Sequence, residues 1–156
     1  MSRSKKKIKK RIINPDLKYK SKLIQMFVQR IMKKGKKQLA YKIVLNSLLE
    51  IKNKTEQDPI AIVEQALRHT LPSVEIRSRR FAGSVYSIPV EINLERSTSL
   101  AIRWIISSCK MRSSKKISDQ LANELIDNSN KLGNAVRKKE EISKIASRNT
   151  RTIKNI

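Results

Sequence analysis

Three of the four residues from Arg77 to Arg80 are arginines, which makes this run the densest group of arginines in the sequence. A guanidinium group can form two parallel hydrogen bonds to a phosphate and can stack on an unpaired nucleobase. Phe81 follows directly, and its ring could stack on a base or pack across a strand, with neither role favoured. Tyr86 is expected to pack, because it shares a face with Ile88 and Val90 in an extended chain. This run therefore indicates recognition of a nucleic acid.

Three other clusters of basic residues and the N-terminal segment extend the candidate binding surface. Four lysines surround Gly35 at residues 33–37, where the two at the start of a helix would oppose the helix dipole. We therefore interpret that cluster as a phosphate contact in preference to a solvated loop. The complete candidate set is Arg3, Lys5, Lys6, Lys7, Lys9, Lys10, Arg11, Lys33, Lys34, Lys36, Lys37, Arg77, Arg79, Arg80, Lys110, Arg112, Lys115, Lys116, Arg137 and Lys138.

The charge balance points to the same kind of partner. The chain has 156 residues, with 36 Lys and Arg against 13 Asp and Glu, and a formal net charge of +23. Solubility needs a net charge of only about 2–8, so the excess indicates a polyanion such as nucleic acid. A membrane-surface role is disfavoured, because several separate apolar stripes indicate a folded core. The spread of the clusters over several elements favours a folded RNA over a DNA groove read by one helix.

Motifs for catalysis or metal binding are not recognisable. The three glycines form no phosphate-binding loop and no nucleophile elbow. Cys109 and His69 are single residues of their types, which excludes an internal disulfide and a His/Cys metal site but leaves a carboxylate-held Mg²⁺ open. Cys109 lies in an apolar run and is expected to be buried, whereas His69 is expected at a helix end. We therefore expect no enzyme activity and no cofactor, and assign no metal ligands.

Residues 1–13 carry seven basic side chains and no acid, so we expect a disordered arm that becomes ordered on an anionic partner. The segment lacks the apolar centre of a secretory signal and the alternating apolar face of an import presequence. No apolar run of about 18 residues predicts a membrane span. The 23 Lys and 21 Ile residues are favoured by A/T-rich codons, which suggests the genome of an organelle or a reduced bacterium.

The segment at residues 72–92 alternates with period two and predicts a β-hairpin. Residues 82–84 supply the reversal, because Gly83 can adopt a positive φ without a Cβ clash. Pro89 lacks an N–H, which places its arm at a sheet edge or beside a bulge. Because a two-stranded ribbon is marginal alone in water, we expect its base to lean on helices and its arginines to project.

Three helices are predicted before the hairpin from apolar residues at helical spacing. The first runs from residue 21 towards Gly35, which we expect to be its C-cap. The second covers residues 37–51, with Leu39 facing inward. The third begins with Asp58 as N-cap and Pro59 as first residue.

Three more helices are predicted after the hairpin. The fourth has Ser97 or Thr98 as N-cap and almost no polar face, so we expect it to be central, with Trp104 in the core. The fifth covers residues 117–131 and the sixth 135–149, with Ile145 facing inward, and the tail at 150–156 has no period. The predicted fold is mainly α, a six-helix single domain with a projecting two-stranded antiparallel β-ribbon between helices three and four. It comprises a basic arm at residues 1–13 and one helical RNA-binding domain at 14–156, including the ribbon at 72–92.

Several motifs in one order resemble those of a known family. They are VEIRSRR at residues 74–80, GSVYSIPVE at 83–91, LAIRWI at 100–105, LANEL at 121–125, and GKK at 35–37 followed by Ile43, Val44 and Ser47. Together they resemble the family of the seventh protein of the small ribosomal subunit, in its bacterial and plastid form. The similarity covers essentially the whole chain. Ala82 departs from the family, which usually has a second glycine there, as do Glu95 and Ser97 in a linker that is commonly more basic, and the tail at 150–156 lacks the aromatic ending common in bacteria.

The resemblance implies a helical fold with a projecting ribbon and a structural role in translation. It implies primary binding to the three-prime major, or head, domain of small-subunit rRNA, nucleation of head assembly, and neighbouring head proteins as partners. It also implies a position near the exit-site tRNA and the mRNA path for the ribbon tip, which is Phe81, Ala82, Gly83, Ser84 and Val85. The expected location is the ribosome of a plastid (chloroplast) stroma, with the bacterial cytoplasm or a mitochondrion as alternatives.

Composition alone leaves two other functions open. An architectural DNA-binding protein of a nucleoid would share the charge, but it should be a two-fold dimer with apolar wedges for the minor groove. A small basic nuclease or RNA-modifying enzyme is the third hypothesis. Co-sedimentation with small ribosomal subunits at high salt would separate the first hypothesis from both others.

Overall fold

The computed structural model of the protein describes residues 13–81, 83–114 and 116–153. These residues form six helices and one two-stranded antiparallel sheet, and the predicted fold class is confirmed. The elements are α1 (Lys22–Ile31), α2 (Lys37–Thr55), α3 (Pro59–Thr70), β1 (Val74–Phe81), β2 (Ser84–Glu91), α4 (Leu94–Lys110), α5 (Ile117–Ser129) and α6 (Asn134–Ile153).

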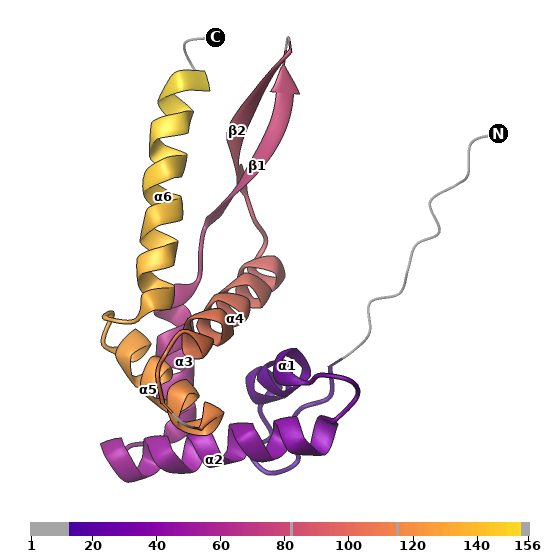
Figure 1. The fold of residues 1–156 in the computed structure, drawn as a ribbon, viewed down its shortest axis with the longest axis vertical. Coiled ribbons are helices and arrows are strands. Elements are labelled where there is room, and N and C mark those ends of the chain that lie inside the picture. The colour runs from indigo at the N-terminus through magenta and orange to yellow at the C-terminus, as the bar shows by residue number, and fades with distance from the viewer. Residues whose placement is uncertain (1–12, 82, 115, 154–156) are drawn as a thin grey trace, which may run out of the picture.

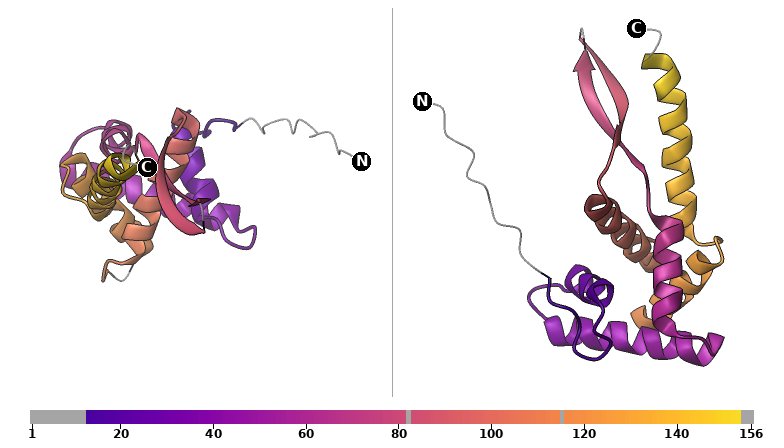
Figure 2. Two further views of the ribbon diagram at one scale, coloured as in Figure 1. Left: turned by 90° about the horizontal axis from the view of Figure 1, so that it is seen from above. Right: turned by 180° about the vertical axis from the view of Figure 1, so that it is seen from behind.

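The helices α1 to α5 form a body from which the β-ribbon and α6 rise together (Figure 1). The view from behind shows the same arrangement, with α2 across the end of the body opposite the ribbon tip (Figure 2). The ribbon does project, as predicted, but α6 accompanies it: the Asn149 side-chain amide donates to the Ser87 carbonyl oxygen over 2.8 Å. The last helix therefore supports a ribbon that would be marginal alone.

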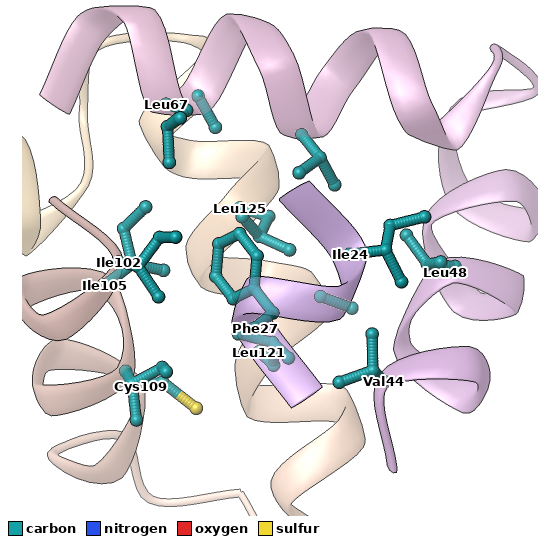
Figure 3. Close-up of a cluster of buried hydrophobic side chains, with 14 of the residues drawn as sticks. Ile24, Phe27, Val44, Leu48, Leu67, Ile102, Ile105, Cys109, Leu121 and Leu125 are labelled. Carbon is teal, nitrogen blue, oxygen red and sulfur yellow. The ribbon is translucent and has the colours of Figure 1, made fainter. Parts of the chain in front are cut away.

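The core lies between α1, α2, α3, α4 and α5 (Figure 3). Phe27 lies among aliphatic side chains from neighbouring helices, such as Leu48, Ile105 and Leu121. Trp104 is 8% exposed and Cys109 is 2% exposed, so both are buried as predicted, on a helix that packs against α1, α3, α5 and α6. Burial of these apolar surfaces is the dominant favourable contribution to folding.

The hairpin pairs β1 with β2 from Val74 opposite Glu91 to Phe81 opposite Ser84. The reversal includes Gly83, which has φ +85°, a left-handed value that an L side chain rarely adopts. Pro89 lies opposite Ile76 in a strand that is an edge of the sheet, as its missing N–H requires. The predicted hairpin is therefore confirmed over the described residues.

The starts of α3 and α4 show how a competing partner changes a predicted cap. Asp58 accepts from the Ile60 N–H over 3.2 Å with Pro59 as the first helical residue, so the predicted start of α3 is confirmed. The predicted start of α4 was wrong, because its N-cap is Asn93. The Ser97 hydroxyl instead donates to the Pro72 carbonyl oxygen over 2.6 Å, which ties α4 to the chain segment before β1.

Three predicted helix ends were also wrong. α2 continues past residue 51 to Thr55. α1 ends at Ile31 with Met32 as C-cap, and Gly35 lies beyond it in the loop to α2. α6 continues through residue 149 to Ile153. These ends differ because capping and packing decide where a helix stops, and the apolar period reports neither.

Two side chains predicted to face inward are exposed. Leu39 is 55% exposed near the start of α2, and Ile145 is 43% exposed on α6. The apolar stripe of a helix is buried only where a neighbouring element covers it. The period of the sequence does not show where that cover ends.

Candidate nucleic-acid interface

The loop between α1 and α2, together with the first residue of α2, presents four exposed lysines, Lys33, Lys34, Lys36 and Lys37. Lys34 and Gly35 have φ of +51° and +74°, so the chain reverses sharply between the two helices. The turn is held by the Lys36 N–H donating to the Lys33 carbonyl oxygen over 3.1 Å. None of the four ammonium groups forms an ion pair with a described residue. They are therefore available to an external anion.

The arginines of β1 are exposed, and they differ in their internal partners. Arg77 donates from Nε to Glu75 Oε1 over 2.5 Å, and Arg96 on α4 donates to the other oxygen of Glu75 over 3.1 Å. The hydrogen bond from Arg77 holds the pKa of Glu75 below its usual range. Arg79 and Arg80 have no carboxylate partner among the described residues. These two guanidinium groups are the freer anion-binding groups of the ribbon.

A basic stripe on α4 combines the predicted candidate Lys110 with two arginines that the sequence did not single out, Arg96 and Arg103. Arg96, Arg103 and Lys110 are exposed, whereas the residues on the other sides of the helix are largely buried. Their spacing of seven residues returns nearly to the same face of a helix after two turns. That spacing was the available signal, but it indicates an exposed stripe only once the packing of α4 is known.

The α4 stripe joins the two clusters that sequence analysis treated as separate. At the N-terminal end of α4, Arg96 and Arg77 bind the same carboxylate. At the C-terminal end, Lys110 lines the same groove as Lys33 and Lys36. The basic residues therefore form a connected path, named here the cationic path, which comprises Arg77, Arg79, Arg96, Arg103, Lys110, Lys33, Lys34, Lys36 and Lys37. Arg80 lies on the opposite face of the ribbon, beside this path.

Arg112 has internal partners instead of a free guanidinium group. Its Nε donates to Glu124 Oε2 over 2.7 Å, and its Nη2 donates to Asp127 Oδ2 over 2.5 Å. The Glu124 side chain is fully buried, with 0% exposed. Arg112 thus compensates a buried charge within the fold. The run of basic residues around it in the sequence does not indicate this ion pair.

The remaining candidates are not members of the cationic path. Lys116 is exposed just before α5, and Arg137 and Lys138 are exposed on α6. Gly83, Ser84 and Val85 are exposed at the ribbon tip. The candidates outside the described residues are Arg3, Lys5, Lys6, Lys7, Lys9, Lys10, Arg11, Lys115 and Ala82, together with the side chain of Phe81.

The groups considered for other chemistry occupy structural positions. His69 Nδ1 is 3.1 Å from the Asn128 carbonyl oxygen near the end of α3, and burial raises the pKa of the Cys109 thiol to about 11. A hydrogen bond shared by Glu50 and Asp119 raises the pKa of Glu50 and lowers that of Asp119. Across the described ranges, no group of three or more His, Cys, Asp or Glu side chains could hold a metal ion. Nor does any described helix have the length and apolar character needed to cross a membrane.

Comparisons with known proteins identify the family of the chain. The chain matches ribosomal protein S7p/S5e over residues 2–150. It is 49% identical over 149 residues to small ribosomal subunit protein uS7c of Tupiella akineta, covering 96% of this chain and 95% of that relative. It is 45% identical over 141 residues to the uS7c protein of Prototheca wickerhamii, covering 90% of each. With uS7 of Arthrospira platensis the identity is 42% over 142 residues and 91% of each chain. The chain therefore belongs to the ribosomal protein S7p/S5e family, as a structural component of the small subunit of plastid ribosomes.

Proposed function

We propose that this protein binds the three-prime major domain of small-subunit rRNA through the cationic path and so nucleates assembly of the subunit head. The proposal rests on one observation, which is that the cationic path is continuous from the β-ribbon along α4 to the lysines between α1 and α2. β1 has 8 residues and α4 has 17, so each spans about 25 Å at the usual rise per residue. A path of this length can contact phosphates of several RNA segments at once.

The other basic residues add contacts at the margins of this surface. We assign rRNA contacts to Arg80, to the basic side chains of residues 1–13, to Lys115 and Lys116, and to Arg137 and Lys138. Arg112 is assigned a different role, because its guanidinium group is engaged by two carboxylates. It positions the α4–α5 loop, and the flanking lysines contact the RNA.

The ribbon tip, residues 81–85, has a separate role in the proposal. Its described residues 83–85 lie at the end of the ribbon away from helices α1 to α5 (Figure 1), so they contribute little to the core and can reach beyond the primary rRNA contact. We assign it to the neighbourhood of the exit-site tRNA and the mRNA path. Assembly would then depend on the base of the ribbon, and translation on its tip.

Binding to a transcribed three-prime major domain, measured at several salt concentrations, tests the primary contact. The variant Arg96→Ala/Arg103→Ala should bind more weakly, and its salt slope should fall by about 0.7–0.9 for each lost phosphate contact. Lys52→Ala is the matched control, because Lys52 is exposed on α2 and lies outside the cationic path. Equal slopes for the double variant and the control would rule out the α4 stripe, and equal affinity for duplex DNA would favour a nucleoid protein.

Replacing residues 81–85 with a two-residue Asn-Gly turn tests the role of the tip. Subunits reconstituted with this variant should sediment normally, but they should hold exit-site tRNA less well or lose the reading frame more often. Failure of assembly would show that the tip is part of the primary contact. Assembly with wild-type translation would show that it has no such role.

A further inference from the structure

An apolar groove opens at the surface where α1, α2, α4 and α5 meet, with a volume of about 190 Å³. Its lining includes Leu39 and Ile43 of α2, Ile106 of α4 and Ile117 of α5. Leu39 is 55% exposed and Ile117 is 50% exposed, so large aliphatic side chains face water there. Exposed apolar surface next to polar residues is typical of a site covered by a partner.

Three lysines line the same groove, Lys33 and Lys36 from the α1–α2 loop and Lys110 from the end of α4. None of them forms an ion pair with a carboxylate in the part of the chain that the structure describes. They come from two separate elements, so the positive charge flanks the apolar surface from different sides. The ligand that complements this arrangement has an apolar group with anionic groups around it.

We propose that this groove binds a short acidic segment of another protein, which inserts one large aliphatic side chain between Leu39 and Ile117 and places carboxylates against Lys33, Lys36 and Lys110. This site is additional to rRNA binding but shares Lys33, Lys36 and Lys110 with the cationic path, so a bound peptide leaves Lys34 and Lys37, which do not line the groove, as the rRNA contacts of this loop. The residues 1–13 of the chain itself do not suit the groove, because seven basic side chains and no acid would be repelled by its lysines.

An unpaired RNA base is the competing occupant, because phosphates would also suit the lysines. The lining of the groove argues against it. Its uncharged side chains are aliphatic apart from Cys109, and no aromatic ring on which a base could stack lines it among the described residues. A base inserted there would lose hydrogen bonds to water without gaining partners, whereas an aliphatic side chain has none to lose.

Methyl NMR spectra of the full chain with labelled isoleucines test the proposal with defined peptides. The probe is the capped peptide Asp-Glu-Leu-Glu-Asp, and Asp-Glu-Ser-Glu-Asp has the same charge without the apolar side chain. The leucine peptide should shift the methyl signals of Ile43, Ile106 and Ile117, and the serine peptide should not. Equal shifts with both peptides would mean only general attraction to a basic protein and would overturn the proposal. So would groove shifts that appear with hexauridylate and not with the leucine peptide.

Two pairs of matched variants locate the site. Leu39→Gln should weaken binding of the leucine peptide about fivefold to tenfold, as expected for loss of part of a buried leucine contact. Leu49→Gln is its control, because Leu49 is on the same helix, is 46% exposed and does not line the groove. Lys36→Gln should likewise weaken binding more than Lys42→Gln, an exposed lysine of α2 outside the groove. Equal effects within either pair would show that the peptide binds elsewhere.

Discussion

Arg79 in the β-ribbon and Arg112 in the α4–α5 loop have similar sequence surroundings and opposite structural roles. Both stand among other basic residues with a serine and a further cation nearby. Arg79 is exposed and has no carboxylate partner among the described residues, whereas Arg112 contacts Glu124 and Asp127. The difference is made by a fully buried glutamate that lies 12 residues away in the sequence from Arg112. A basic cluster therefore indicates a binding surface only when its side chains form no ion pair with a buried acidic residue of the fold.

The Glu124 corner also positions the helix that supports the ribbon. Besides its contacts with Arg112, Glu124 Oε1 accepts from the Asn128 side-chain amide and from the Ala135 N–H, each over 3.2 Å. Ala135 lies in the first turn of α6, so the buried carboxylate fixes where that helix begins. α6 in turn contacts the ribbon at Ser87 through Asn149. One internal ion pair thus helps to hold the ribbon and its external arginines in place.

Of the variants that test the difference between Arg79 and Arg112, Arg112→Ala should have the largest effect, on the stability of the fold. Removing the guanidinium group leaves Glu124 buried without its cation, at a cost of about 3–5 kcal/mol of unfolding free energy. Urea denaturation measures it, with Arg79→Ala as a control that should leave the midpoint unchanged. The double variant Arg112→Met/Glu124→Met should be less destabilised than the sum of its single changes. Additive effects would show that the two side chains do not interact.

Gly133→Ala should have the next largest effect, at the same corner. A Cβ at this position would lie 1.9 Å from Asn128 Oδ1 and 2.6 Å from its Cγ. Asn128 cannot turn away without losing its bond to Glu124, so we expect a cost of about 1–3 kcal/mol from overpacking. Thermal denaturation measures this cost. If Asn128→Ala fails to relieve it in the double variant, the collision is not its cause.

Arg79→Ala/Arg80→Ala should affect binding and leave the fold intact. Two lost phosphate contacts predict a fall in the salt slope of about 1.4–1.8, with an unchanged melting temperature, because neither side chain is buried. Filter binding to the three-prime major domain gives the slope, and circular dichroism gives the melting temperature. A lowered melting temperature with an unchanged slope would reverse the roles assigned to the ribbon and the corner.

Glu75→Gln should have the smallest effect and should sharpen the contrast between exposed and buried ion pairs. Arg77 and Arg96 are about half exposed, so losing their pairs with Glu75 should cost little stability. Both guanidinium groups become free for phosphate, so rRNA affinity should rise slightly. A fall in affinity would mean that Glu75 orients the two arginines for RNA.

The pH dependence of the same site follows from the lowered pKa of Glu75. A carboxyl whose pKa is depressed in the folded state stabilises the protein above its ordinary pKa of 4.5 and loses this contribution as the pH falls through the folded value. The wild type should therefore lose slightly more stability than Glu75→Gln in acid denaturation below that range. Parallel curves for the two proteins would show that the pair contributes nothing to stability.

Local sequence determined which elements form and which partner class suits the charge. The period-two pattern of residues 72–92 predicts the hairpin, and Asp58 followed by Pro59 predicts the start of α3. Trp104 and Cys109 are recognisable as core residues because their neighbours are apolar on nearly every side of one helix. These inferences succeed because each depends on residues within a few turns of the chain.

Only the tertiary structure decided which charges remain free and how the elements are joined. The partner of Arg112 lies on another helix, and the exposed face of α4, which links the ribbon to the lysines between α1 and α2, is defined by what packs on its other sides. The Ser97 hydroxyl looks like a helix cap in the sequence, but it binds the Pro72 carbonyl oxygen 25 residues away. The physical reason is the same in each case: desolvation and hydrogen bonding depend on atoms that folding brings together from distant parts of the chain, and no local period records them.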